Sequence, residues 1–223
     1  MQLEHKTPSL RAAASANGGI YLLAAHPNWG ESRTNRRLRD AVQTLGTVQV
    51  CDLYERYPDY DIDVSAEQER LASAQLVVLM HPIQWYSMPA LQKLWIDEVL
   101  TYGWAYGVGG TSLRGKDLWL LASTGGPQSS YHPQGYNRYF FDAFLPPYEQ
   151  TAALCGMRFL PPLILYGAHT VSERELSEHV DLVRERLMSY PNWPEIDAIE
   201  QCPECAVPSF DRPHEQTALK DSA

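Results

Sequence analysis

Five short apolar runs, separated by stretches with helical spacing, constrain the fold of this chain more than any other feature. Apolar runs of this length without strict alternation are typical of parallel strands that are buried on both faces. Strands that alternate with helices need crossover connections, which are right-handed in nearly all proteins. The sequence therefore predicts an α/β fold, a three-layer sandwich with a five-stranded parallel sheet. The expected strands lie at Ile20–Ala25, Thr47–Leu53, Gln75–Met80, Leu118–Ser123 and Arg158–Tyr166.

The helical stretches carry their own start signals. Ser65 with Gln68, and Ser172 with Glu175, have the spacing of a capping box, so we expect a helix to begin at each pair. Proline is favoured in the first turn of a helix because its missing N–H is not needed there, and Pro89 suits that position. The other helices are expected from Ser32 onward and near Phe141–Leu154.

Length and charge limit the organisation and the partners of the chain. Its 223 residues suffice for one substantial core, which we place at residues 20–189. Residues 1–19 are predicted to be an N-terminal extension, and residues 190–223 an acidic, proline-containing tail that carries seven acidic and two basic side chains. The net charge of −9 argues against nucleic acid as a partner. No apolar run approaches the roughly 20 residues of a membrane span, and no secretory signal is visible, so we expect a cytoplasmic protein.

The four cysteines make a poor disulfide framework for a chain of this length. Cys51 and Cys155 lie in apolar surroundings and are interpreted as small buried hydrophobic residues. Cys202 and Cys205 form a C-x-x-C motif, but no second pair accompanies it. We favour chance occurrence over a zinc or redox site, and no metal is expected.

The segment between the first strand and the first helix is rich in polar side chains. Ser32, Thr34 and Asn35 offer short donors, and His26 or Arg33 would add charge. Free N–H groups and the helix dipole at this point favour an anion such as a phosphate. A capped helix without a ligand explains the same residues equally well. Neither G-x-G-x-x-G nor the P-loop motif is present, which argues against a dinucleotide Rossmann site and a nucleotide triphosphatase.

Aromatic side chains follow the third strand in a loop bounded by two prolines. Trp85 and Tyr86 would wall a flat heterocycle, while Gln84 and the peptide groups from Ile83 onward would bind its polar edge. Ligands of such sheets lie outside the carboxyl ends of the strands, and this loop is at such an end. Ordinary core packing of the two aromatic rings is the alternative.

The loop after the fourth strand has small and polar residues. Ser123 and Thr124 supply hydroxyl groups, and Gly125 and Gly126 would let the backbone approach a ligand closely. An ordinary glycine-rich turn is the alternative. If the fold is correct, this loop and the two preceding ones converge on one crevice.

The three loops together resemble a known family. The chain is similar to the flavodoxin-like NAD(P)H quinone reductases, and within them most to the ancillary subunits of glutathione-gated potassium-efflux antiporters, the KefF and KefG type. The resemblance covers residues 20–188 and is densest over residues 81–107. The motifs that carry it are His-Pro and Ser-x-x-Asn within 26–35, Trp-Tyr-Ser-x-Pro-Ala-Leu-x-Lys-x-Trp-Ile-Asp at 85–97, Gly-Trp-Ala-Tyr-Gly at 103–107 and Thr-Gly-Gly at 124–126.

The resemblance implies a bound flavin, FMN rather than FAD, that takes a hydride from NAD(P)H and reduces a quinone or a related electrophile. It places the flavin phosphate on His26 and Ser32–Asn35. It places the ring against Ile83–Tyr86 and Ser123–Gly126. The flavin supplies the redox chemistry, and the protein positions and hydrogen-bonds the ring.

The resemblance also names candidates for catalysis. Tyr131 matches a family tyrosine that hydrogen-bonds the quinone or the reduced flavin. Mammalian members have a histidine six residues after that tyrosine, where this chain has Asn137. His132 is therefore the candidate for assisting protonation.

The family is dimeric, which implies a homodimer with residues 91–99 and 103–110 near the partner. For Trp95, Trp104 and Tyr106, packing within one subunit is an equally good explanation. The subgroup implies a second hypothesis, a regulatory subunit that binds a potassium antiporter at the inner face of the membrane. A one-electron carrier is a third, and the roomy aromatic loop argues against it.

Overall fold

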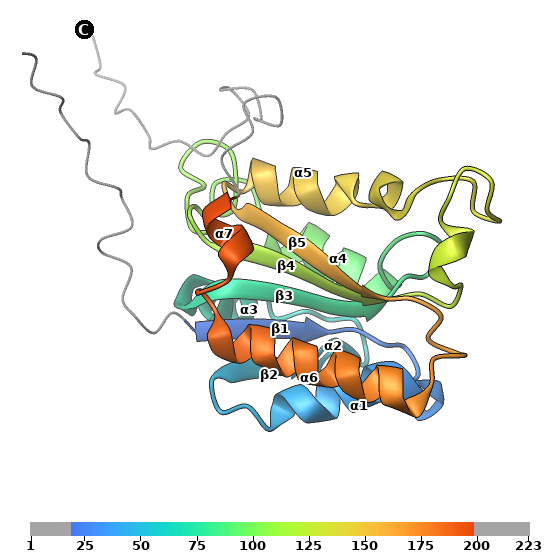
Figure 1. Ribbon diagram of the computed structural model, residues 1–223. Coiled ribbons are helices and arrows are strands. Elements are labelled where there is room, and N and C mark those ends of the chain that lie inside the picture. Colours follow the sequence, from blue (N-terminus) through green and yellow to red (C-terminus); the bar gives the residue numbers. More distant parts are fainter. Residues whose placement is uncertain (1–18, 199–223) are drawn as a thin grey trace, which may run out of the picture.

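The computed structural model describes residues 19–198, which form a central sheet with helices on both faces (Figure 1). The strand order is β2-β1-β3-β4-β5, and every neighbouring pair is parallel. The three-layer α/β fold predicted from the sequence is thus confirmed. This order changes direction between β1 and β3, where sheets of this type bind their ligands. The strands are β1 Gly19–Ala24, β2 Val48–Asp52, β3 Ala74–Pro82, β4 Asp117–Ser123 and β5 Arg158–Leu165.

The helices divide between the two faces of the sheet. One face is covered by α1 and α6, and the other by α3, α4 and α5, as Figure 1 shows. The helices are α1 Arg33–Gln43, α2 Leu53–Arg56, α3 Val64–Ser73, α4 Ala90–Val99, α5 Pro146–Leu154, α6 Glu173–Ser189 and α7 Pro194–Ala198, with short 3₁₀ turns at η2 Trp29–Glu31, η3 Gln128–Ser130 and η4 Phe141–Phe144.

Both faces of the sheet are apolar, as expected for parallel strands. Along β1, Tyr21 and Leu23 face the core under α3 and α4, whereas Leu22 and Ala24 face the core under α1 and α6. Successive side chains of a strand point to opposite faces, so one continuous apolar run supplies two cores. Cys51, also in a core, is buried as predicted, and burial raises the pKa of its thiol to about 11.

Two of the predicted helix starts need comment. The capping box of Ser172 and Glu175 is present at the start of α6. The one predicted for Ser65 is wrong, because α3 begins earlier and Asp63 is its N-cap, with a side chain that accepts the N–H of Ala66 at 3.0 Å. Aspartate and serine cap helices about equally well, so the local sequence did not decide between them.

Prolines shape the second half of the chain. The helix expected over 141–154 is divided into η4 and α5, since Pro146 opens α5 and begins a new ladder of hydrogen bonds. Pro161 and Pro162 lie inside β5, which is an edge strand, and the register shifts beside them. An edge strand tolerates proline because one row of its N–H groups has no partner strand.

The domain continues beyond the boundary predicted at residue 189. Trp193 and Ile196 are buried in the core under α6, and the Trp193 ring meets Trp119 of β4 edge-on at 4.9 Å. Residues 190–196 therefore pack on the domain instead of belonging to a loose tail, because Trp193 and Ile196 anchor them. Gly19 likewise belongs to β1. Residues 1–18 and 199–223, including the C-x-x-C motif, lie outside the described residues.

The amino edge of the sheet is closed by a network of ionic and polar contacts. Asp117 is buried and accepts two hydrogen bonds from the guanidinium of Arg158, at 2.8 and 2.7 Å, and one from the hydroxyl of Tyr190 at 2.7 Å. Lys116 beside it donates to the carbonyls of Ala72 and Ala74. Every charge named here has a partner.

A buried carboxylate joins several elements under the sheet. Glu67 of α3 is fully buried and accepts hydrogen bonds from Tyr21 at 2.6 Å, Tyr57 at 2.6 Å and Trp95 at 2.9 Å. Arg70 pairs with the same carboxylate at 3.0 Å. Trp95 therefore packs within one subunit, which was one of the two explanations considered for it. No helix between residues 19 and 198 is both long and apolar enough to traverse a bilayer.

Candidate functional site

The carboxyl edge of the sheet brings the predicted loops together through one residue. Ser123, at the end of β4, exchanges hydrogen bonds of 2.9 and 3.1 Å with the side chain of Asn35 in α1. Its carbonyl accepts the N–H of Ile83, after β3, at 2.7 Å. The loops after β1, β3 and β4 therefore meet at the end of the sheet, as the fold predicted.

The start of α1 has the features of an anion site. Ser32 is its N-cap, yet the serine side chain makes no capping hydrogen bond. The first amide of the helical ladder is that of Arg36, which donates to the Ser32 carbonyl, so the amides of Arg33, Thr34 and Asn35 precede the ladder. No acidic residue lies in this first turn. The dipole and the unused amides both favour a negatively charged group here.

Arg33 is directed away from this first turn. Its guanidinium pairs with Glu173 of α6 at 2.7 Å and donates to the carbonyl of Val171. Arg37, one turn further along α1, pairs with the same carboxylate. The charge expected at the anion site is thus used to join α1 to α6.

His26 is oriented by its own loop. Its Nδ1 accepts the N–H of Asn28 at 3.1 Å, so the neutral ring carries its proton on Nε2. Burial lowers the pKa of this imidazole. The centre of the His26 ring lies 5.2 Å from that of Trp29. The guanidinium of Arg39 lies over the Trp29 ring and also pairs with Asp52. His26 is therefore a neutral donor held near the start of α1.

The loop after β3 contains a strained turn. Gln84 and Ser87 exchange backbone hydrogen bonds of 2.9 and 3.0 Å around Trp85 and Tyr86, whose φ angles are 48° and 65°. Two successive left-handed residues form a type I′ turn, for which asparagine and glycine are preferred. Left-handed backbone costs an ordinary residue about 1 to 2 kcal/mol. The Trp85 side chain is 94% exposed, so packing within the described residues does not offset this cost.

Strain of this kind points to a function for the turn. A two-residue turn leaves its two central N–H groups unpaired, and those of Trp85 and Tyr86 donate to no acceptor among residues 19–198. Within residues 19–198, the amides of Gly125 and Gly126 in the neighbouring loop also donate to no acceptor. These four donors lie on the two loops that we expect to flank a flavin ring.

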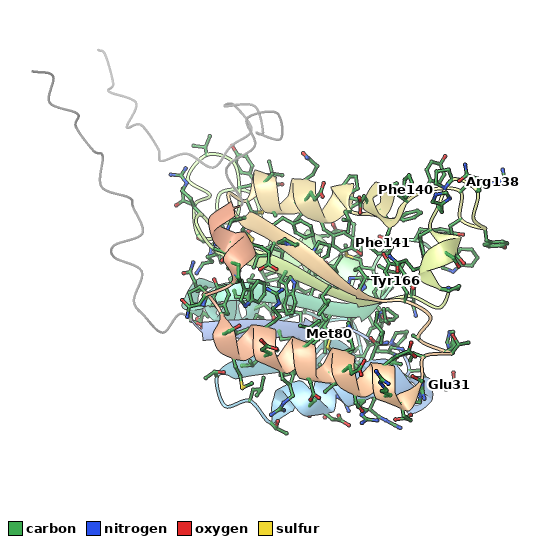
Figure 2. The ribbon with its side chains drawn as sticks, viewed as in Figure 1. Glu31, Met80, Arg138, Phe140, Phe141 and Tyr166 are labelled. Atoms are coloured by element: carbon green, nitrogen blue, oxygen red, sulfur yellow. The ribbon has the colours of Figure 1, made fainter. Side chains whose placement is uncertain are left out.

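A group of aromatic side chains, here called the aromatic wall, lies beside these loops and consists of Tyr86, Tyr131, Phe141, Phe144 and Tyr166. Tyr131 contacts Phe141 at 5.3 Å, Phe144 at 6.0 Å and Tyr166 at 5.6 Å between ring centroids, and Tyr86 stacks on Phe144 at 5.3 Å. Figure 2 shows Phe141 and Tyr166 side by side, as their centroid distance of 5.7 Å requires. Burial raises the pKa of Tyr131, against a hydrogen bond with Thr124 that lowers it. Tyr131 is thus a neutral phenol next to the loop after β4.

His132, the second catalytic candidate, has a side chain that contacts Gln134 and Phe140 of its own loop. Its Nδ1 accepts the N–H of Gln134 at 3.3 Å, and its ring meets Phe140 edge-on at 5.2 Å. Figure 2 shows Arg138 at the outer end of this loop, with Phe140 between it and Phe141. Neither of these two contacts of His132 involves the residues of the loops that meet at Ser123.

His81 begins the predicted loop after β3 but belongs to the strand. It is fully buried, with Nδ1 3.0 Å from the carbonyl of Pro82 and Nε2 3.4 Å from the hydroxyl of Tyr148. Burial lowers the pKa of His81 to about 4. This histidine is therefore neutral near pH 7 and has no access to a ligand.

The sequence analysis did not single out the loop after β5, residues 166–172. Gly167 and Ala168 donate to the carbonyls of Gly126 and Thr124 at 2.9 and 2.8 Å, so this loop forms part of the same edge. It contributes Tyr166 to the aromatic wall. The available signal was the fold itself, since β5 is a parallel strand and ends at the same edge as the others.

Comparison with known proteins agrees with the resemblance seen in the motifs. The family model Flavodoxin_2, described as a flavodoxin-like fold, matches residues 19–187. The glutathione-regulated potassium-efflux system ancillary protein KefF of Citrobacter koseri is 41% identical over 171 residues, which cover 77% of this chain and 96% of the relative. The KefF protein of Salmonella newport is 40% identical over 182 residues, 80% of this chain and 98% of the relative.

Solved structures give a similar result. A structure described as a thermophilic tryptophan halogenase from Streptomycin violaceusniger is 39% identical, with a TM-score of 0.73 over 75% of this chain and 98% of that chain. General stress protein 14 of Treponema denticola, in complex with FMN, is 34% identical, with a TM-score of 0.69. The match covers 82% of this chain and 99% of that chain. An NADPH-quinone reductase from P. pentosaceus is 25% identical, with a TM-score of 0.69. The match covers 75% of this chain and 96% of that chain. Since these names differ, the activity has to be argued from the site and not from the fold.

Proposed function

The chain belongs to the Flavodoxin_2 family of flavodoxin-like proteins, and from this premise and its site we propose that it is an FMN-dependent NAD(P)H:quinone oxidoreductase. The observation that carries the proposal is the set of unused backbone N–H groups on three loops that meet at Ser123. Exposed donors that converge on one edge, beside an aromatic wall, fit a flat ligand with a polar rim and an anionic tail. One relative with the same fold is described in complex with FMN.

The residues at the start of α1 fit the flavin phosphate. The amides of Arg33, Thr34 and Asn35 and the hydroxyls of Ser32 and Thr34 would hold it, with the Nε2 proton of His26 as a further donor. The Arg33 side chain has no part in this proposal because it is paired with Glu173. Phosphate binding here rests on backbone donors and hydroxyls, without a cation.

The loops after β3 and β4 fit the ring. The amides of Trp85, Tyr86, Gly125 and Gly126 would donate to its polar edge, and Ile83 and Gln84 would line its side. Bound FMN would supply the redox chemistry, which is transfer of a hydride from NAD(P)H to the acceptor. The chain would hold the two reactants in contact and exclude water with its aromatic side chains.

The aromatic wall fits a quinone. Tyr131, Phe144 and Tyr166 present a partly buried apolar surface, on which a planar acceptor would rest. As a neutral phenol, Tyr131 would donate a hydrogen bond to a carbonyl oxygen of the acceptor. A related protein described as an NADPH-quinone reductase has the same fold.

Purified protein tests the proposal. We expect it to be yellow or to take up added FMN, and to oxidise NADPH when benzoquinone is present. Thr34→Val, which removes one hydroxyl at the start of α1, should weaken FMN binding about tenfold, the effect of one hydrogen bond to a charged group. Thr151→Val is the matched control, because that hydroxyl donates to the carbonyl of Pro147 in α5. Colourless protein that neither binds FMN nor oxidises NADPH with a quinone would refute the proposal.

A second candidate is a regulatory subunit of a potassium antiporter at the cytoplasmic face of the membrane. It is supported by the KefF relatives, whose names describe an ancillary protein of a glutathione-regulated potassium-efflux system and whose length the chain covers almost completely. Co-purification with an antiporter, and potassium efflux that persists in Trp85→Ala, would support this function independently of catalysis. A homodimer is proposed with it, since Tyr102 and Val108 expose apolar surface on the loop after α4. Size-exclusion chromatography with light scattering tests the dimer.

A further inference from the structure

The loop after β5 places a histidine against the glycine pair of the site. His169 is exposed, and a Cβ atom on Gly125 would lie 3.3 Å from both Cδ2 and Nε2 of its ring. The loop is held there by two backbone hydrogen bonds, from Gly167 to the carbonyl of Gly126 and from Ala168 to that of Thr124. The backbone of this loop is thus held in place, and the imidazole lies beside the loop that we propose to contact the flavin ring.

The other histidines of this edge are unsuited to exchange a proton with an acceptor. The one N–H of His26, on Nε2, is assigned to the flavin phosphate, and His81 is fully buried. His132 accepts the N–H of Gln134 and lies against Phe140. Within residues 19–198, the ring nitrogens of His169 make no hydrogen bond, so both are available to a ligand.

Charge around His169 is balanced. The next charged side chain along the chain, Glu173, pairs with Arg33 and Arg37 of α1. Tyr131, whose ring would lie 4.0 Å from a Cβ atom on Gly126, is a phenol that is neutral near pH 7. Within residues 19–198 no carboxylate forms an ion pair or a hydrogen bond with the imidazole, so none of them competes with an acceptor for its proton.

Building on the proposed function, we propose that His169 is the proton donor for quinone reduction. The reductant is NAD(P)H, which provides a hydride and therefore two electrons. Reduction of the quinone by a hydride leaves one oxygen as an anion. The N–H bond of the His169 imidazolium breaks, an O–H bond forms on that oxygen, and the neutral hydroquinone leaves. A proton from solvent then restores the imidazolium, and imidazole is the side chain best suited to this cycle near neutral pH.

This assignment replaces His132, the candidate taken from the resemblance. General acid catalysis contributes on the order of 10²- to 10⁴-fold, and we expect the lower end because quinones accept hydride readily. His169→Gln should therefore lower kcat/KM for benzoquinone on the order of 100-fold. Reduction of ferricyanide, which takes electrons and no proton, should fall far less in the same variant. A merely structural role would lower both rates together.

The matched variant is His132→Gln, which removes a histidine from the neighbouring loop. A selective loss of quinone reduction in His132→Gln, with none in His169→Gln, would overturn the proposal. So would equal losses with quinone and ferricyanide in His169→Gln. Failure of the proposed function is distinguishable, because then the unmodified protein itself would reduce neither acceptor.

A second measurement does not depend on activity. Diethyl pyrocarbonate modifies accessible imidazoles, and mass spectrometry locates the product. In FMN-loaded protein we expect His169 to be modified readily and His81 hardly at all. Added duroquinone, with no NAD(P)H present, should slow the modification of His169 and leave that of His132 unchanged. Slower modification of His132 instead would assign the acceptor to the outer part of that loop and contradict the proposal.

Discussion

The two edges of the same sheet differ in how they satisfy their polar groups. At the amino edge, the buried carboxylate of Asp117 has three donors, from Arg158 and Tyr190, and Lys116 is bonded to two carbonyls. At the carboxyl edge, backbone amides remain unused and Trp85 projects into solvent from a left-handed turn. The first edge contributes stability, and the second retains strain and free donors.

This difference separates the two roles of the chain. A fully satisfied network gains little from any further ligand, whereas unused donors and strained backbone are features of sites that bind one. Substitutions at the amino edge should therefore change folding and leave FMN binding intact. Substitutions in the strained turn should change ligand binding at the proposed site, and those that relieve the strain should also raise stability.

The largest expected effect on folding is at the amino edge. Asp117→Ala removes the acceptor of two hydrogen bonds from Arg158 and of one from Tyr190, which should lower the free energy of unfolding by about 3 kcal/mol. Urea denaturation measures this loss. FMN affinity, determined under conditions where the variant is folded, should equal that of the unmodified protein. A large loss of FMN affinity would show that the two edges are coupled and would break the comparison.

A pH dependence is the next largest effect, and it comes from a buried histidine near the carboxyl edge. Burial lowers the pKa of His81 to about 4, from about 6.5 in the unfolded chain. Between these values the unfolded chain binds a proton that the folded protein does not, so the free energy of unfolding decreases as the pH falls. The loss should reach about 2.5 kcal/mol by pH 4.5.

The contribution of His81 is isolated by comparing urea denaturation of the unmodified protein and of His81→Phe at pH 7.0 and 4.5. Phenylalanine keeps a ring to stack on Tyr148 but cannot bind a proton. Other groups titrate in both proteins, so only the difference between their pH dependences counts. An identical decrease in both would mean that His81 does not resist protonation in the folded state.

The smallest effect has the opposite sign. Trp85→Asn places a residue that tolerates left-handed backbone in the type I′ turn, and should raise the free energy of unfolding by about 1 kcal/mol. The same substitution removes the indole that we expect beside the flat ligand, so KM for the quinone should rise. Tyr136→Asn is the matched control, because Tyr136 is also highly exposed but its backbone is not left-handed. A loss of stability in Trp85→Asn would show that the indole packs on the protein after all.

Most of the fold could be predicted from local sequence. The five apolar runs identify the strands because burial on both faces requires such runs. The single turn of α2 was missed, since its signal is only the capping of Glu55 by Asp52. The start of α3 was misplaced because Asp63 and Ser65 are both good capping residues, and tertiary packing decides between them.

The site could be predicted only in part. The loops were identified because parallel strands end at one edge, but long-range pairing is not visible in a sequence. Arg33 is paired with Glu173, which lies 140 residues away. His169 has no motif around it and reaches Gly125 only through the fold. The left-handed conformation of Trp85 and Tyr86 runs against their own preferences, so no propensity predicts it.

Glu67 has a consequence for how the chain assembles. A carboxylate can leave water at tolerable cost only when its donors are already in position, and these come from β1, the end of α2 and α4. None of them comes from β5 or α6. The first half of the chain therefore has to close as one cooperative unit, onto which the later strand and helix can add. Amide exchange should show β1, α3 and α4 opening together.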